Sequence, residues 1–241
     1  MKSFAAIAAL VISAPAAAVP TAITHANVWT TADDKPIEDA TIIIDHGQIL
    51  SITAHGKVPA NAMRIDADRH IATPALIDAA TQIGLGEVGG IDEERRGRVD
   101  SGPLGAAFAV SYGFDSEDSA VRQARADGVG RAMIYPDGSA RAPFDGIAAL
   151  VRLGDAKAEV ERPRSAVVVT IGGNSASRVG GSSGAAWQLL RNGLDEARAF
   201  RATGLRGRSD GAILNHSDAD ALKHVLARTM PLIIQCDRLS D

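Results

Sequence analysis

The sequence predicts an α/β fold in which a small all-β unit comes before a parallel sheet with crossover helices. Two observations support this prediction. Short β-branched runs separated by turn residues fill the chain up to residue 68, as in a small β unit. After residue 70, apolar strand patterns alternate with helical patterns, which is typical of a parallel sheet.

Strand patterns in the first part of the chain are short and bounded by turn signals. We expect strands at residues 23–29, 40–45, 48–52 and 64–68. The second and third flank the turn Asp45-His46-Gly47, where Gly47 can take the positive φ that a tight hairpin requires. These segments predict a compact β unit that ends near residue 70.

Strands and helices alternate in the second part of the chain. Strands are expected at 71–78, 129–135, 166–171 and 231–236, and the segment 144–153 has a mixed pattern that fits no single class. One helix is expected at 116–126, capped by Asp115 or Ser116 and stopped by Gly128. A second is expected at 184–202 and a third after the cap residue Ser217.

The first eighteen residues have the features of an export signal. Lys2 gives a positive start, residues 4–12 are apolar, and small residues 16–18 provide a cleavage site. A buried N-terminal helix is the alternative. No other segment is long and apolar enough to span a membrane. We therefore expect a signal peptide at 1–18 and a mature protein that is periplasmic or secreted, with Cys236 as its lone cysteine and no internal disulfide.

Composition excludes some functions. The chain has 46% hydrophobic and 22% charged residues and a formal net charge of −4, which is typical of a globular protein. A nucleic-acid-binding protein would present a basic face. Aromatic residues make up only 4% of the chain, so stacking platforms for bases are also unexpected.

Two stretches resemble a known family. Residues 39–52 (DATIIIDHGQILSI) and 71–84, which contain TPALIDA, resemble the opening of the amidohydrolase superfamily, and most of all its imidazolonepropionase-like and dihydroorotase-like members. From residue 115 onward the resemblance is looser but collinear. It implies part of a β-sandwich at 19–70, followed at 71–241 by an incomplete (β/α)8 TIM-type barrel of about four strands.

The resemblance also implies a chemistry. Family members bind zinc or another divalent metal through an H-x-H pair at the end of the first barrel strand. The metal activates a water molecule that hydrolyses a non-peptide C–N bond of cyclic amide type. In this sequence Ala80 and Gln82 stand at the two histidine positions, and Asp78 matches an aspartate that supports the site. A later strand ends in Gln235 and Asp237, where the family carries a histidine.

The metal ligands that the resemblance implies are therefore missing. We expect five residues to line the site: Asp78, Gln82, Arg178, Gln235 and Asp237. Arg178 belongs to the loop at 172–184, which is rich in glycine and serine. Asp78 could instead cap nearby backbone N–H groups, and Asp237 could lie at a solvated strand end. No pair of the six histidines has metal-binding spacing, and no catalytic residue is assigned.

Three functions remain open at this stage. The chain could be a metal-dependent hydrolase with a non-standard site, a non-catalytic extracytoplasmic binding protein, or the truncated product of a longer amidohydrolase. A small-molecule ligand is the expected partner, and nucleic acid is not. The segment from 73 to 241 is shorter than the roughly 250 residues of a full barrel, so we expect a covering partner or a further C-terminal half.

Overall fold

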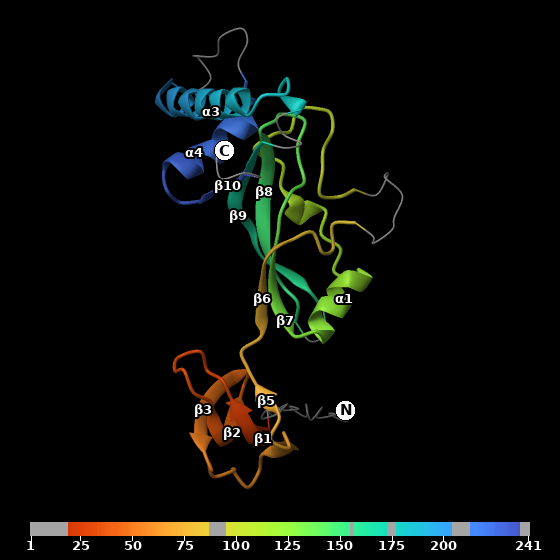
Figure 1. Ribbon diagram of the computed structural model, residues 1–241, viewed down its shortest axis with the longest axis vertical. Coiled ribbons are helices and arrows are strands. Elements are labelled where there is room, and N and C mark those ends of the chain that lie inside the picture. Colours follow the sequence, from red (N-terminus) through yellow and green to blue (C-terminus); the bar gives the residue numbers. More distant parts are fainter. Residues whose placement is uncertain (1–18, 87–94, 155–156, 173–176, 204–212, 237–241) are drawn as a thin grey trace, which may run out of the picture. The chain divides into compact units, whose positions relative to one another are not determined.

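The protein is described by a computed structural model that covers residues 19–86, 95–154, 157–172, 177–203 and 213–236 (Figure 1). The predicted signal peptide and Asp237 lie outside these residues. The chain forms two compact units that divide after Pro74, and each is described by itself. Among the described residues, no helix is long and apolar enough to cross a membrane.

The first unit is a five-stranded sheet. Its strands are β1 (Thr21–Val28), β2 (Ile37–Asp45), β3 (Gln48–Ala54), β4 (Met63–Asp66) and β5 (Ile71–Ala72). They lie in the order β3-β2-β1-β4, and β5 also pairs with β1. The strands predicted in this region are confirmed. So is the hairpin at Asp45-His46-Gly47, where Gly47 has a φ of 74°.

A small core stabilises the first unit. It is centred on four buried side chains from β1 and β2: Ala26, Val28, Ala40 and Ile42. The strand register places Ile23 beside Ile42 and Ile42 beside Ile52, so one apolar row crosses three strands. Cross-strand pairs of this kind are the main source of stability in a sheet with one buried face.

The second unit contains a second sheet of five strands. These are β6 (Leu76–Thr81), β7 (Val129–Ile134), β8 (Phe144–Arg152), β9 (Glu159–Ile171) and β10 (Leu232–Cys236), in the order β10-β9-β8-β7-β6. The predicted parallel sheet is wrong at β8, which runs antiparallel to both β7 and β9. A parallel pair needs a long crossover connection, usually helical. The link from β7 to β8 is a turn at Pro136-Asp137-Gly138 with no helix.

Helices cover one face of the second sheet. The structure has α1 (Ser119–Ala126), α3 (Ser183–Thr203) and α4 (His216–Leu226), with a short 3-10 helix at Val110–Tyr112. The predicted helices are confirmed, but two predicted caps are wrong. Asp118 caps α1 by accepting a hydrogen bond from the N–H of Ala120, and Asn215 caps α4. Each cap lies one turn or less from the predicted residue, and its side chain reaches the free N–H groups.

Two apolar clusters join the helices to the sheet. The larger includes Phe144, Val167, Val169, Leu190 and Leu222, which bring together β8, β9, α3 and α4. The smaller lies under α1. Alternation along β9 places Val168 on the opposite face, in a separate cluster with Ala148 and Ala166. The result is an open mixed sheet with few helices, which loosely fits a partial barrel.

Candidate functional site

The carboxyl ends of four strands meet at one edge of the second sheet. Strands β6 and β7 are parallel, β9 and β10 are parallel, and β8 is antiparallel to both of its neighbours. Strands β6, β7, β9 and β10 therefore all end at the edge where β8 begins. In open α/β sheets, ligands bind outside the carboxyl ends of the strands. This edge is therefore the candidate site.

A buried carboxylate lies at this edge. Asp145, at the start of β8, is only 2% exposed. The hydroxyl of Thr170 on β9 lies 2.6 Å from Asp145 Oδ2 and 3.0 Å from Gln235 Oε1 on β10. Three neighbouring strands thus each contribute one polar side chain to a connected cluster.

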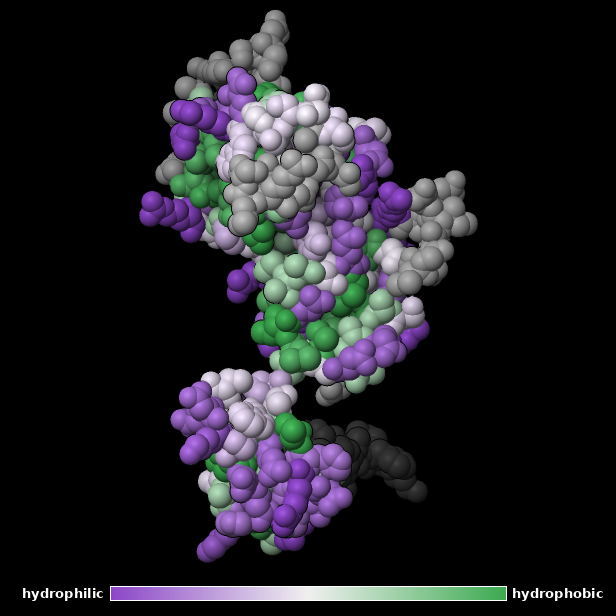
Figure 2. Space-filling view, in the orientation of Figure 1, coloured by the Kyte–Doolittle hydropathy of each residue, from purple (hydrophilic) through white to green (hydrophobic). Residues whose placement is uncertain are grey.

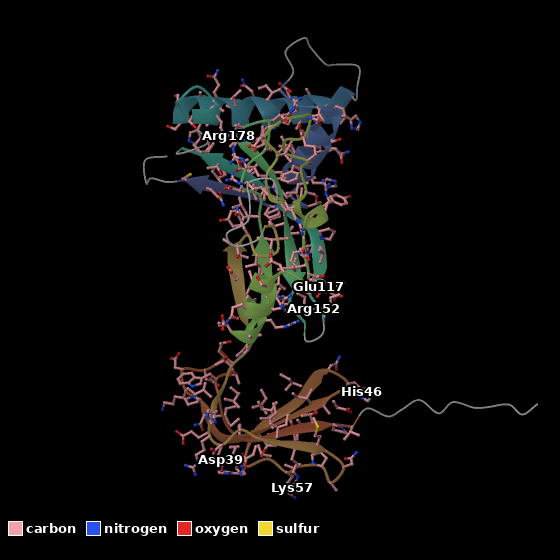
Figure 3. All side chains as sticks on the ribbon, turned by 90° about the vertical axis from the view of Figure 1, so that its right-hand side faces the viewer. Asp39, His46, Lys57, Glu117, Arg152 and Arg178 are labelled. Atoms are coloured by element: carbon pink, nitrogen blue, oxygen red, sulfur yellow. The ribbon has the colours of Figure 1, made fainter. Side chains whose placement is uncertain are left out.

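Arg178 completes this cluster from the segment that leads into α3 (Figure 3). Its Nη1 lies 3.4 Å from Asp145 Oδ1, and its Nη2 donates a hydrogen bond to the backbone carbonyl of Ser139. A Cβ atom at Gly138 would lie 2.8 Å from the Arg178 Nη1, so the missing side chain of this glycine makes room for the guanidinium. Figure 3 places Arg178 at the other end of the second unit from Arg152, which ends β8.

The environment of Asp145 changes its ionisation. Burial raises the pKa of Asp145 from 3.8 to about 6. Hydrogen bonds from Thr170 and the charge of Arg178 act in the opposite direction, while the nearby Asp137 raises the pKa further. Burial has the larger effect on the pKa because the carboxylate loses most of its hydration and gains only one cation in return. Asp145 is therefore an ionisable group whose pKa, about 6, lies well above that of an ordinary aspartate.

A cavity of about 410 Å³ lies at the ends of β6 and β7. Polar and charged lining side chains include Thr81, Gln82, Arg95, Arg98 and Asp137, with Ile83 and Leu85 as apolar wall. Arg98 Nε donates a 2.5 Å hydrogen bond to Asp100 Oδ1, and this contact raises the pKa of Arg98. Its Nη1 donates to the Asp137 carbonyl at 3.2 Å. The cation is thereby held in a fixed position at the cavity wall.

The residues predicted from the sequence are spread over this edge. Arg178 and Gln235 both belong to the Asp145 cluster, and Gln82 lines the cavity. Asp78 Oδ1 accepts a 3.3 Å hydrogen bond from the Ala80 N–H, which is the capping contact considered as its alternative role. Asp237 lies outside the described residues.

The described donors at this edge do not fit a divalent metal. Ala80 has no ligating atom, and Gln82 offers only a neutral amide. Nowhere in the described ranges do three His, Cys, Asp or Glu side chains come close enough to hold one ion. Two of the six histidines are in α4 and four in the first unit. Zinc sites typically use three or four such ligands, so no metal-dependent reaction is assigned to the described residues.

Sequence reasoning did not find Asp145, Thr170, Arg98 or Asp137. The apolar run FDGIAALV at 144–151 contains a single charged residue, Asp145. A lone carboxylate in an apolar run indicates a buried partner, so this signal could have been used. Arg98 and Asp137 carried no comparable signal, because they lie in segments rich in charged and turn residues.

Comparison with known proteins adds one strong likeness. No protein-family model matches the chain, and no curated protein matches it. The structure is similar to that of an amidohydrolase from Thermotoga maritima MSB8, with a TM-score of 0.76 and 16% sequence identity over 91% of this chain. This protein has an amidohydrolase-like fold. It spans 59% of the length of that chain.

A second solved amidohydrolase gives a much weaker match. Its TM-score is 0.27 at 19% identity, over 28% of this chain and 16% of the other. This likeness carries no argument. The fold therefore rests on the Thermotoga maritima structure, and at 16% identity that likeness concerns the fold alone.

Proposed function

We propose that this protein binds a small polar molecule at the carboxyl edge of its second sheet and does so without the metal-dependent hydrolysis that the family resemblance implies. The observation that carries the proposal is the cavity lined by Gln82, Arg98 and Asp137. It lies where ligands of α/β sheets bind. The described residues keep a cavity there and offer no set of metal ligands.

The lining of the cavity favours a ligand with amide or carboxylate groups. A volume of about 410 Å³ falls within the roughly 300–1,000 Å³ of typical small-molecule sites. The Gln82 amide can both donate and accept, Arg98 offers a fixed cation, and Asp137 offers an anion. Cyclic amides, the substrates implied by the resemblance, have matching donors and acceptors. We further propose export of the protein through residues 1–18.

Hydrolysis of non-peptide C–N bonds is the second candidate function. The amidohydrolase-like fold, with its TM-score of 0.76 to a solved amidohydrolase, favours it. This function would require a metal held by residues beyond the described donors, or a different way of activating water. The two functions differ in a measurable way, since a hydrolase consumes its ligand and a binding protein does not.

The test uses the purified full chain. Zinc content is measured by elemental analysis, and binding of hydantoin, dihydrouracil, a small lactam and an N-acyl amino acid is measured by calorimetry. We expect at least one ligand to bind without turnover and without stoichiometric zinc. Gln82→Ala should weaken that binding about fivefold, because one hydrogen bond contributes roughly 1 kcal/mol.

Gln188→Ala provides the matched control. Gln188 lines a separate groove between α3 and β10, so the same change there should leave the affinity unaltered. Turnover of any of the four compounds with one zinc per chain would overturn the proposal in favour of the hydrolase. Absence of binding to all four compounds would also count against it.

A further inference from the structure

We propose that Arg178 and Asp145 form a pH-dependent latch, which holds the segment before α3 against the turn at residues 136–139 and so controls the wall of the ligand cavity. The control of the cavity rests on the proposed function. The latch itself rests on contacts that are independent of any ligand. It joins the segment before α3 to the start of β8 and to the turn at 136–139, which lie 33 and 39 residues earlier in the chain.

Arg178 links the start of β8 to the turn at residues 136–139. One side of its guanidinium lies 3.4 Å from Asp145 Oδ1, and the other donates to the Ser139 carbonyl. The Arg178 side chain is 22% exposed and that of Asp145 is 3% exposed, so the ion pair is largely shielded from water. Shielded pairs are much less screened by salt than surface pairs.

The turn that Arg178 contacts also forms part of the cavity wall. The turn at 136–139 contains Asp137, which lines the cavity. The Asp137 N–H donates to the Gly97 carbonyl at 2.9 Å, and the Val99 N–H donates to the Gly138 carbonyl at 3.2 Å. A shift of Ser139 would therefore be passed to both Asp137 and the segment that carries Arg98.

Among the described residues, charged and polar groups reach Asp145 from several elements. From β9 comes the Thr170 hydroxyl, which also contacts Gln235 on β10. From the segment before α3 comes Arg178, and from the turn comes Asp137, whose charge opposes ionisation of Asp145. The charge of Asp145 contributes to the raised pKa of Arg98, and the charge of Arg178 contributes to the lowered pKa of Asp100. Arg178 is the cation in direct contact with Asp145, so ionised Asp145 and Arg178 depend on one another.

Protonation of Asp145 removes one half of the ion pair. Arg178 then loses the charge that fixes its guanidinium against β8 and orients it toward the Ser139 carbonyl, so its hydrogen bond to the turn weakens as well. Burial raises the pKa of Asp145 to about 6. The latch is therefore closed near pH 7.5 and released near pH 5, a range in which ordinary carboxylates remain ionised.

The experiment is a pH titration of the ligand-free full chain by NMR. The amide signals of Ser139, Arg178 and Val179 are followed between pH 4.5 and 8. We expect these signals to shift together with a midpoint near pH 6. In Asp145→Asn the transition should disappear, and in Arg178→Met the midpoint should rise by about one pH unit, because an opposite charge favours the ionised carboxylate.

Asp195→Asn is the matched control, since Asp195 pairs with Arg198 on the exposed surface of α3 and should not affect the midpoint. The absence of a shared midpoint between pH 5 and 7 in the unaltered chain would overturn the latch, and so would a transition that persists in Asp145→Asn. Because no ligand is present, this result is independent of whether any compound binds. A weaker affinity at pH 5 than at pH 7.5 for a bound compound would support control of the cavity.

Discussion

The two compact units place their charged side chains in opposite ways. In the first unit, His25 pairs with Asp66 and His55 with Asp39, and the histidine side chains are 58% and 76% exposed. The face of this unit seen in Figure 2 is largely hydrophilic. In the second unit Asp145 and Asp218 are 2% and 0% exposed. Both units pair carboxylates with basic side chains, but among the described residues only the second unit has buried acidic residues.

The difference in burial indicates that the first unit is structural and that the second unit carries the candidate site. An exposed pair exchanges water for a partner at little gain, so it is worth about 0–1 kcal/mol. A buried carboxylate loses its hydration and persists only where positioned donors replace it. Buried ionisable groups are therefore found where a fold needs a fixed contact or a shifted pKa. In the second unit Asp218 serves the first purpose, and Asp145 is our candidate for the second.

The largest expected effect is at Asp218. Its Oδ1 accepts hydrogen bonds from the N–H groups of Gly105 at 3.1 Å and Ala107 at 2.8 Å. Asp218→Ala leaves the buried N–H of Gly105 and the partly buried N–H of Ala107 without this acceptor, at up to about 2 kcal/mol each, so the second unit should lose up to about 4 kcal/mol of unfolding free energy. Urea unfolding of the full chain measures this loss.

Two further variants test whether the loss comes from the missing acceptor and from burial. Asp218→Asn keeps one acceptor oxygen and should lose much less, because burial raises the pKa of Asp218 and a neutral side chain avoids this penalty. Asp66→Ala makes the same truncation at an exposed carboxylate of the first unit and should have a far smaller effect. A loss below about 1 kcal/mol in Asp218→Ala would mean that burial does not distinguish the two units.

Much of the fold could be predicted from local patterns. The hairpin at Asp45-His46-Gly47 follows from turn chemistry, and the helix that contains Leu190 and Ala197 follows from its apolar periodicity. Strand β8 could not be assigned because both of its faces are buried. A strand that is apolar on both faces has no alternation, and its direction depends on the length of its connections.

The site was harder to predict than the fold. Gln82 and Gln235 were selected by resemblance and Arg178 by its place in the loop at 172–184, and the structure places all three at the carboxyl edge. Asp145 was missed because its partners, Thr170 and Arg178, follow it by 25 and 33 residues. Contacts at such separations are set by the strand order, which local patterns do not contain.

The next effect in size is the pH dependence that Asp145 gives to stability. Burial raises the folded-state pKa of Asp145 from 3.8 to about 6. Its contribution is therefore fully present below pH 3.8 and is lost as the pH rises through 6. A pKa raised from 3.8 to about 6 corresponds to about 3 kcal/mol between pH 4 and pH 7. Comparing urea unfolding of the unaltered chain and Asp145→Asn across this range isolates the effect.

Other carboxylates change stability in the opposite direction and at lower pH. Hydrogen bonds lower the pKa of four exposed or half-buried groups, so their contributions are present above their ordinary pKa and are lost on acidification: Asp66, Asp100, Asp115 and Glu161. These groups are the same in both proteins and cancel in the difference. If Asp145→Asn follows the unaltered chain between pH 4 and pH 7, Asp145 is not the buried ionisable group described above.

The smallest effect is expected at the histidine pairs of the first unit. His55 has a φ of 50°, its N–H donates to the Asp39 carbonyl, and its Nδ1 lies 2.8 Å from Asp39 Oδ2. His55→Asn removes the pair but retains a residue type that tolerates the left-handed region. We expect the unfolding free energy of the first unit to change by less than about 0.5 kcal/mol, measured by urea unfolding.

His55→Val separates the backbone from the charge. A β-branched side chain at this φ is strained, so valine should cost about 1–2 kcal/mol although it removes the same side-chain contact with Asp39. If asparagine costs as much as valine, the pair with Asp39 stabilises the first unit and surface pairing is not the weak interaction assumed above. If His55→Asn leaves the unfolding free energy unchanged and His55→Val lowers it, the backbone conformation at this turn contributes more to stability than the contact with Asp39. The first unit is then stabilised by its sheet, and the ionisable groups that matter lie in the second.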